Sequence, residues 1–218
     1  MSAADATPSD PARADLSRSD ARRRAILDVA SEVFLAQGYA ATSMSEIAAK
    51  LGGSKGTLYN YFRSKEELFS AFITDTCQGP AMALFDQLPT ADAGKSIRDN
   101  LVEFGANFLG FILSPRLIAL NRIVVGETGR FPELGRMFFD AGPGRGEARF
   151  AQIVEAAMDA GELRREDPIM VGRCLKDLIL SDYHHRQLWG VLGDVPAAQI
   201  RAHVASAVDA FLRAFAAA

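Results

Sequence analysis

The side chains with the clearest chemistry gather in the stretch SKGTLYNYF, residues 54–62. If this stretch is helical, Leu58 and Phe62 lie four positions apart on one side, and most of the polar side chains lie on or beside the other. Lysine, threonine, asparagine and tyrosine suit phosphate oxygens and the edges of bases in a DNA groove. Alternatively, Tyr59 and Tyr61 are ordinary half-buried aromatic residues. Their combination with the neighbouring polar groups favours a binding surface.

Short helices must position this stretch, and the sequence marks where they begin and end. Ser43 with Glu46 makes a capping box at the start of one short helix, and Gly52-Gly53 ends it. Ser54 caps the next. A longer helix precedes this pair and another follows, and two short helices joined by a glycine turn form a helix-turn-helix pattern. The expected helices cover about 19–38, 43–51, 54–62 and 64–77.

The distribution of charge agrees with a nucleic-acid surface in this region. Residues 18–65 hold eight basic and four acidic side chains, a local balance of +4 in a chain whose net charge is −3. A protein that is acidic overall binds nucleic acid through local positive charge. The same side chains could be solvated faces, so charge alone leaves both interpretations open.

Longer helical segments follow, without the sustained apolar–polar alternation of strands. We therefore predict an all-α fold of about nine helices, with a three-helix helix-turn-helix domain at 18–64 and a larger helical domain at 65–218, whose first part, 65–77, is a connecting helix. Residues 1–17, rich in Ala, Pro, Ser and Asp, are predicted as a disordered tail. A break is expected near 142–146. The later helices are expected at 95–113, 115–129, 131–160, 168–190 and 196–216.

Composition excludes several other classes of protein. Cys77 and Cys174 lie far apart and form neither a disulfide framework nor a zinc spacing, which fits a reducing compartment. No apolar run reaches the roughly 18–20 residues of a membrane span. The N-terminus lacks the basic start and apolar stretch of a signal peptide. We therefore expect a cytoplasmic protein that does not associate with a membrane.

Enzymatic and metal sites find little support. The segment GGSKGT differs from the G-x-x-x-x-G-K-[ST] phosphate-binding loop, and no strand precedes it. Asp182-Tyr183-His184-His185 contains metal-binding residue types, but adjacent histidines point to different sides of a helix and no third ligand is suitably spaced. We predict that the protein is not an enzyme and holds no cofactor and no metal.

The segment TSMSEIAAKLGGSKGTLYNYFRSKEELFSAFI resembles the DNA-binding domain of TetR-family transcriptional regulators. The preceding helix, ARRRAILDVASEVFLAQGYAATS, resembles it as well, so the match covers roughly residues 20–75. The resemblance implies a homodimer whose small domain binds double-stranded operator DNA and whose large domain dimerises and binds a small-molecule effector. The family default is a repressor released by its ligand, here a small apolar or aromatic one. The alternative is a small-molecule-binding or scaffold protein of this fold without specific operator recognition.

The resemblance also implies which residues contact DNA. Gly53 departs from the pattern, since the family usually has valine or another small apolar residue there, and the missing side chain loosens the packing of the turn. The expected DNA-binding residues are Thr42, Ser43, Ser45, Ser54, Lys55, Gly56, Thr57, Tyr59, Asn60, Tyr61 and Lys65.

The segment LIALNRIVVGETGRFPELGRMFFDAGPGRG is similar to the C-terminal domain of the AefR-like subgroup, which names no ligand. Apolar, aromatic and polar residues on the middle helices are the pocket candidates, although an aromatic stripe is more often core. Those expected in the pocket are Phe104, Phe108, Phe111, Arg122, Met137, Phe138, Leu178, Asp182, Tyr183 and Trp189, with Ile112, Asn121, Glu127 and His184 as further candidates.

The resemblance implies that the last two helices, 168–190 and 196–216, pair with their mates as a four-helix bundle in the dimer. The residues expected at the interface lie on the last helix. It carries an apolar face, and interspersed alanines allow a partner to approach closely. The alternative is that the same face packs within the chain. The expected interface residues are Val204, Val208, Phe211, Leu212 and Phe215.

Overall fold

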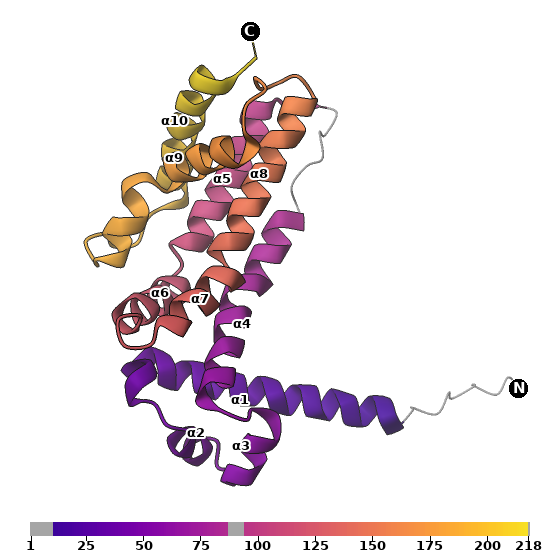
Figure 1. Cartoon of the computed structure of the whole chain (residues 1–218), viewed down its shortest axis with the longest axis vertical. Coiled ribbons are helices and arrows are strands. Elements are labelled where there is room, and N and C mark those ends of the chain that lie inside the picture. Colours follow the sequence, from indigo (N-terminus) through magenta and orange to yellow (C-terminus); the bar gives the residue numbers. More distant parts are fainter. Residues whose placement is uncertain (1–10, 87–93, 218) are drawn as a thin grey trace, which may run out of the picture. The chain divides into compact units, whose positions relative to one another are not determined.

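The computed structural model describes residues 11–86 and 94–217, and within them ten α-helices and no strand (Figure 1). The prediction of an all-α fold is confirmed. Residues 1–10 of the predicted tail lie outside the described residues, whereas 11–17 belong to the first helix. The helices are α1 (Pro11–Ala41), α2 (Met44–Lys50), α3 (Lys55–Tyr61), α4 (Lys65–Asp86), α5 (Ile97–Ile112), α6 (Pro115–Glu127), α7 (Pro132–Ala141), α8 (Pro143–Asp159), α9 (Pro168–Leu188) and α10 (Ala197–Phe215).

The first compact unit ends at Phe72 and contains α1, α2, α3 and the first part of α4. Its short helices begin where the sequence predicts. The Ser43 hydroxyl accepts a hydrogen bond from the Glu46 backbone N–H at 3.2 Å, and the Ser54 hydroxyl accepts one from the Thr57 N–H at 3.2 Å. Gly52, at φ 65°, makes the turn between α2 and α3. These local contacts fix the angle of α3.

Aromatic rings form much of the core of this first unit. The Phe34 ring packs edge-on against Phe69, with ring centroids 4.9 Å apart, and Tyr39 packs against the same ring at 4.9 Å. Such pairs stabilise a core beyond the area that they bury. The core therefore joins α1 and the first part of α4 to the short helices α2 and α3. Its fully buried members include Ile26, Ala30, Phe34, Ile47, Phe62, Leu68, Phe69 and Phe72.

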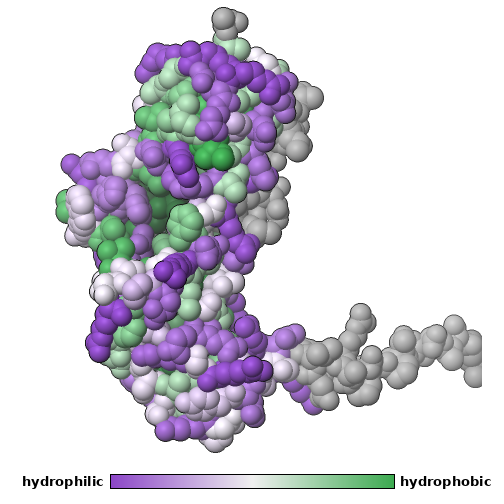
Figure 2. Space-filling model, viewed as in Figure 1, coloured by the Kyte–Doolittle hydropathy of each residue, from purple (hydrophilic) through white to green (hydrophobic). Residues whose placement is uncertain are grey.

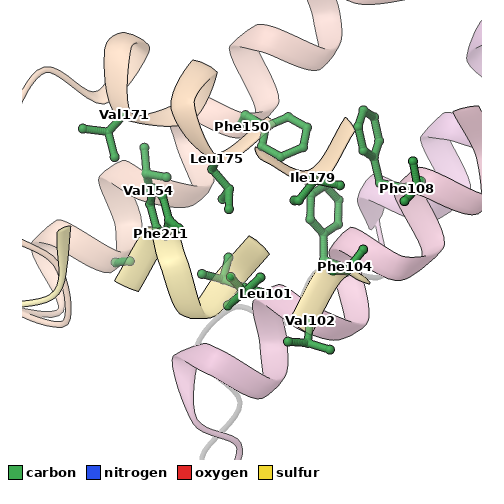
Figure 3. Close-up of a cluster of buried hydrophobic side chains, with 14 of the residues drawn as sticks. Leu101, Val102, Phe104, Phe108, Phe150, Val154, Val171, Leu175, Ile179 and Phe211 are labelled. Carbon is green, nitrogen blue, oxygen red and sulfur yellow. The ribbon is translucent and has the colours of Figure 1, made fainter. Parts of the chain in front are cut away.

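The second compact unit begins at Ile73 and contains the rest of α4 and α5 to α10. Figure 3 shows its core, where Phe104 and Phe108 of α5 face Phe150 of α8 and Ile179 of α9. A glycine permits a close contact between two helices of this core. A Cβ on Gly105 would lie 2.7 Å from a methyl of Val204, so α5 and α10 pack closely together there.

Three helical segments differ from their predicted form. The segment predicted at 131–160 is two helices, α7 and α8, which meet at Gly142 within the expected break. α4 continues through Gly79 and Pro80 to Asp86, although its predicted end is about residue 77. α9 carries an unexpected interruption at Ser181, whose φ of 34° and ψ of −132° are not helical.

Among the described residues, no single helix is long and apolar enough to cross a bilayer. The pair α5 and α6 meets the criterion of length and composition only when joined, and the two helices are bent by 60°.

Candidate nucleic-acid interface and ligand cavity

Two buried side chains hold α3 in position. Leu58 is 1% exposed and Phe62 is fully buried, so both anchor the helix as the sequence predicts. The Phe62 backbone N–H donates to the Leu58 carbonyl at 3.0 Å, and the Arg23 guanidinium lies 4.9 Å from the centre of the Phe62 ring. Phe62 is thus held by a backbone hydrogen bond to Leu58 and by the contact of its ring with Arg23.

The opposite side of α3 is open to solvent. Lys55, Gly56 and Asn60 are exposed, and Tyr59 is 47% exposed, a large fraction for an aromatic residue. Thr57 and Tyr61 are half-buried at the edges of this face. The structure therefore brings the predicted residues of α3 together on one surface. The remaining exposed candidates, at or beside the starts of α2 and α3, are Ser43, Ser45 and Ser54.

Two of the predicted DNA-binding residues, Thr42 and Lys65, form hydrogen bonds within the protein instead. Thr42 is 2% exposed, and its hydroxyl donates to the Gly38 carbonyl at 2.7 Å. The Lys65 ammonium donates to the Tyr39 carbonyl at 2.9 Å and to the Thr42 carbonyl at 3.0 Å, and it lies 4.4 Å from the centre of the Tyr39 ring. In this conformation Lys65 ties the start of α4 to the end of α1, and the Thr42 hydroxyl bonds back to the last turn of α1.

A carboxylate completes this junction. The Tyr39 hydroxyl donates to Glu66 at 3.0 Å. A backbone hydrogen bond, followed by bonds from Ser64 and Tyr39, holds the pKa of Glu66 below its usual range. The junction therefore favours the ionised carboxylate.

The larger unit contains a cavity of about 230 Å³. On the face shown in Figure 2, hydrophobic surface of this unit lies in a recess flanked by polar side chains. The wall is mostly apolar and comes from α4 to α9. Its residues are Cys77, Gln78, Phe108, Phe111, Ile112, Leu117, Asn121, Phe138, Ala141, Gly142, Pro143, Arg145, Gly146, Lys176, Leu180 and His184.

Of the predicted pocket residues, Phe108, Phe111 and Phe138 line the cavity, and so do the further candidates Ile112, Asn121 and His184. Sequence analysis missed Cys77, Leu117 and the residues at the α7–α8 junction. It also missed Lys176 and Leu180, although their four-residue spacing on α9, before the interruption at Ser181, was a signal.

The other predicted pocket residues lie elsewhere. Phe104 is 4% exposed and packs in the core against Phe150, with ring centroids 5.2 Å apart. Arg122 donates to the carbonyls of Gln187 and Leu188, and Tyr183 packs against the His203 ring. Leu178 and Trp189 are exposed, by 37% and 70%. Of the rest, Asp182 pairs with Arg186 at 2.6 Å, and Met137 and Glu127 are half-buried outside the cavity wall.

Asn121, His184 and Cys77 contribute uncharged polar groups to the cavity wall, which also contains Arg145 and Lys176. The Asn121 amide and His184 Nε2 lie 3.2 Å apart, and burial, with a smaller contribution from His185, lowers the pKa of His184. Burial also raises the pKa of the Cys77 thiol to about 12. Lys176 is paired with Glu147 at 3.2 Å. The cavity can therefore bury a largely apolar or aromatic molecule and offer it one neutral hydrogen-bonding pair.

The pKa of His184 predicts how stability depends on pH. Because its folded pKa lies below the usual value of 6.5, the unfolded chain binds more protons as the pH falls below about 6.5. Stability is therefore full above this pH and declines below it. We expect thermal unfolding between pH 5 and 7.5 to show this decline, and His184→Gln to flatten it. The exposed His185→Gln is the control, and an equal effect of both variants would contradict the assignment.

The predicted dimer residues lie mainly inside the chain. Val204, Val208 and Phe211 are fully buried against α5 and α9, so their contribution to an interface is not supported. The apolar face of α10 packs in the core of its own unit, which is the alternative that the sequence left open. Leu212 and Phe215 are partly buried at the edge of the same cluster.

The fold and the exposed face of α3 define a DNA-binding transcriptional regulator of the helix-turn-helix class. Residues 26–72 match the family model of bacterial regulatory proteins of the tetR family. Residues 99–217 match that of the AefR-like transcriptional repressor, C-terminal domain. The chain belongs to the TetR family, in agreement with the sequence prediction, and the proteins of this family are not enzymes.

Individual relatives agree with this assignment. A TetR-family regulator structure from Mesorhizobium loti superposes with a TM-score of 0.81 at 25% identity, covering 91% of this chain and 98% of that one. The structure of the flavonoid-responsive regulator FrrA superposes with a TM-score of 0.76 at 31% identity, covering 90% and 98%. The transcriptional activator FasR of Mycolicibacterium smegmatis is 50% identical over 54 residues, which is 25% of each chain.

Proposed function

We propose that this chain is a dimeric repressor whose release from operator DNA is controlled by a small apolar or aromatic molecule. The observation that carries the proposal is the face of α3, where Lys55, Tyr59 and Asn60 are exposed while Leu58 and Phe62 hold the helix in place. In a dimer, two such helices would enter successive major grooves of a near-palindromic operator. This function places the protein with its DNA in the cytoplasm.

The cavity supports an aromatic effector. Three phenylalanine rings line it, and its polar pair, Asn121 and His184, is neutral, so a molecule with few charges would lose little hydration on entry. The description of FrrA as flavonoid-responsive supports the same class of ligand, a flat aromatic molecule with hydroxyl groups. One hydroxyl could bond to the Asn121–His184 pair.

α4 offers a route from ligand to DNA. Cys77 and Gln78 of this helix line the cavity, and Leu68, Phe69 and Phe72 of the same helix are buried in the core of the first unit. A ligand that binds one conformation of α4 more tightly than another would shift the equilibrium between the two conformations. The affinity for DNA would then change by the same coupling free energy.

A dimer interface is proposed on the solvent side of α9 and α10. Met170 and Leu178 are 39% and 37% exposed, and with Cys174 between them they form an apolar stripe at four-residue spacing. Ala202 and Ser206 give α10 a small-residue surface beside solvent. These residues replace the buried ones as the contact surface.

We expect Leu178→Glu to yield monomers in sedimentation at micromolar concentration, because it places a charge in the apolar stripe. Val125→Glu, at a 59% exposed position on α6, should leave the dimer intact. A dimer that persists in Leu178→Glu would move the interface elsewhere.

A mobility-shift titration with the DNA upstream of the chain's own gene tests the proposed function. Sequence-specific binding that weakens with salt is expected, followed by release when a flavonoid or another small aromatic is added. Purely non-specific binding would favour the alternative, a small-molecule-binding or scaffold protein. Reporter expression with and without the gene would fix the sign of regulation, since FasR is named an activator.

A further inference from the structure

We propose that Arg22 of α1 is an additional DNA-phosphate contact, held beside the recognition helix by the space that Gly53 leaves open. The proposal rests on the proposed operator binding through α3. It adds a residue from a different helix, which the sequence analysis did not identify.

The geometry begins at the turn between α2 and α3. Arg22 Nη2 lies 3.2 Å from the position that a Cβ on Gly53 would occupy. Arg22 also borders a small hollow together with Ser54, Thr57 and Leu58 at the start of α3. The guanidinium therefore lies beside the residues that present the exposed face of α3.

The backbone does not explain the glycine at position 53. Gly52 has the positive φ that the turn requires, at 65°, whereas Gly53 is not among the residues with positive φ. An alanine at Gly53 would fit the backbone, but its methyl would press on the Arg22 guanidinium. The absence of a side chain at Gly53 therefore makes room for Arg22.

The charge of Arg22 is available for a ligand. Arg22 is exposed, and in the part of the chain that the structure describes no carboxylate lies within ion-pair distance of it. The next two arginines make contacts within the protein, since Arg24 pairs with Asp28 at 3.2 Å and Arg23 lies over the Phe62 ring. A guanidinium with free donors forms strong, often bidentate, hydrogen bonds with phosphate.

Arg22→Ala tests the proposal in an operator titration across a range of salt concentrations. We expect affinity to fall about three- to tenfold at low salt, and the slope of log affinity against log salt to fall by about one per recognition helix. Arg22→Lys should retain most of the slope because it keeps the charge. Arg24→Ala is the matched control, since it removes the same charge from the same helix at a position already paired with Asp28.

Gly53→Ala tests the link between the two residues. It should displace the guanidinium and lower affinity in the same direction, and the double variant Arg22→Ala/Gly53→Ala should bind no more weakly than Arg22→Ala. Thermal unfolding of each variant checks that the fold is retained. An unchanged salt slope in Arg22→Ala, or fully additive effects, would overturn the proposal. Loss of sequence-specific binding in the unchanged chain would instead overturn the proposed function.

Discussion

Gly172→Ala is expected to lower the free energy of unfolding of the larger unit by about 3 kcal/mol, at the upper end for overpacking. A Cβ on Gly172 would lie 2.8 Å from the Ala151 backbone nitrogen and 2.9 Å from the Phe150 carbonyl carbon. Both are backbone atoms inside α8, so they cannot rotate away as a side chain could. The added methyl must push α8 and α9 apart, and the contacts of Phe150 with the core would loosen.

Gly110→Ala is the matched control in the same unit. It also adds one methyl within a helix, but no atom lies within 4 Å of the new Cβ. Alanine has the higher helix propensity, so we expect a gain of about 0.5–1 kcal/mol. Urea unfolding followed by helical circular dichroism compares the two variants. Similar changes in both would show that the α8–α9 contact tolerates a side chain.

The helix-turn-helix unit could be predicted closely because its signals are local. The capping serines Ser43 and Ser54 bond to backbone N–H groups three residues away, and Gly52 provides the positive φ of the turn within the same short segment. Leu58 and Phe62 are separated by one helical turn, which fixes the buried side. The exceptions are Thr42, whose hydroxyl bonds back to Gly38 in the last turn of α1, and Lys65, which depends on contacts between α1 and α4 that are distant in the sequence.

The cavity could be predicted only in part because helical periodicity does not continue through α9. Ser181 has non-helical dihedral angles, so residues before and after it do not follow one helical repeat. Leu178, just before the interruption, and Trp189, after it, are both exposed, although their apolar side chains favour a place in a pocket. The α7–α8 junction presents a similar difficulty, since Gly142 and Pro143 reach the cavity from a break.

An apolar stripe on a terminal helix does not reveal which surface it covers. Val204 and Phe211 have the spacing of an interface face and equally that of a core face. Gly105 decides the outcome, because its missing side chain lets α5 approach Val204 within the same chain. This contact joins residues about a hundred positions apart, and periodicity carries no information about it.

Phe62→Ala and Tyr59→Ala are expected to separate the fold of the first unit from its DNA contact. Phe62 is fully buried, so its truncation should cost about 3–5 kcal/mol of unfolding free energy, a large part of the stability of a small domain. The loss would free α3 from its anchor and remove specific binding together with the fold. Thermal unfolding and operator titration of the same preparation measure both effects.

Tyr59, three residues earlier on the same helix, should behave in the opposite way. It is 47% exposed, so Tyr59→Ala should change stability by less than about 0.5 kcal/mol. Operator affinity should nevertheless fall about tenfold or more, because a hydrogen bond to a charged phosphate contributes roughly 1.5–3 kcal/mol. Tyr59→Phe, which keeps the ring, would assign the loss to the hydroxyl. A stable Tyr59→Ala variant with unchanged affinity would show that the exposed face of α3 is not the reading surface, since a solvent-facing tyrosine at its centre could not then be touching DNA.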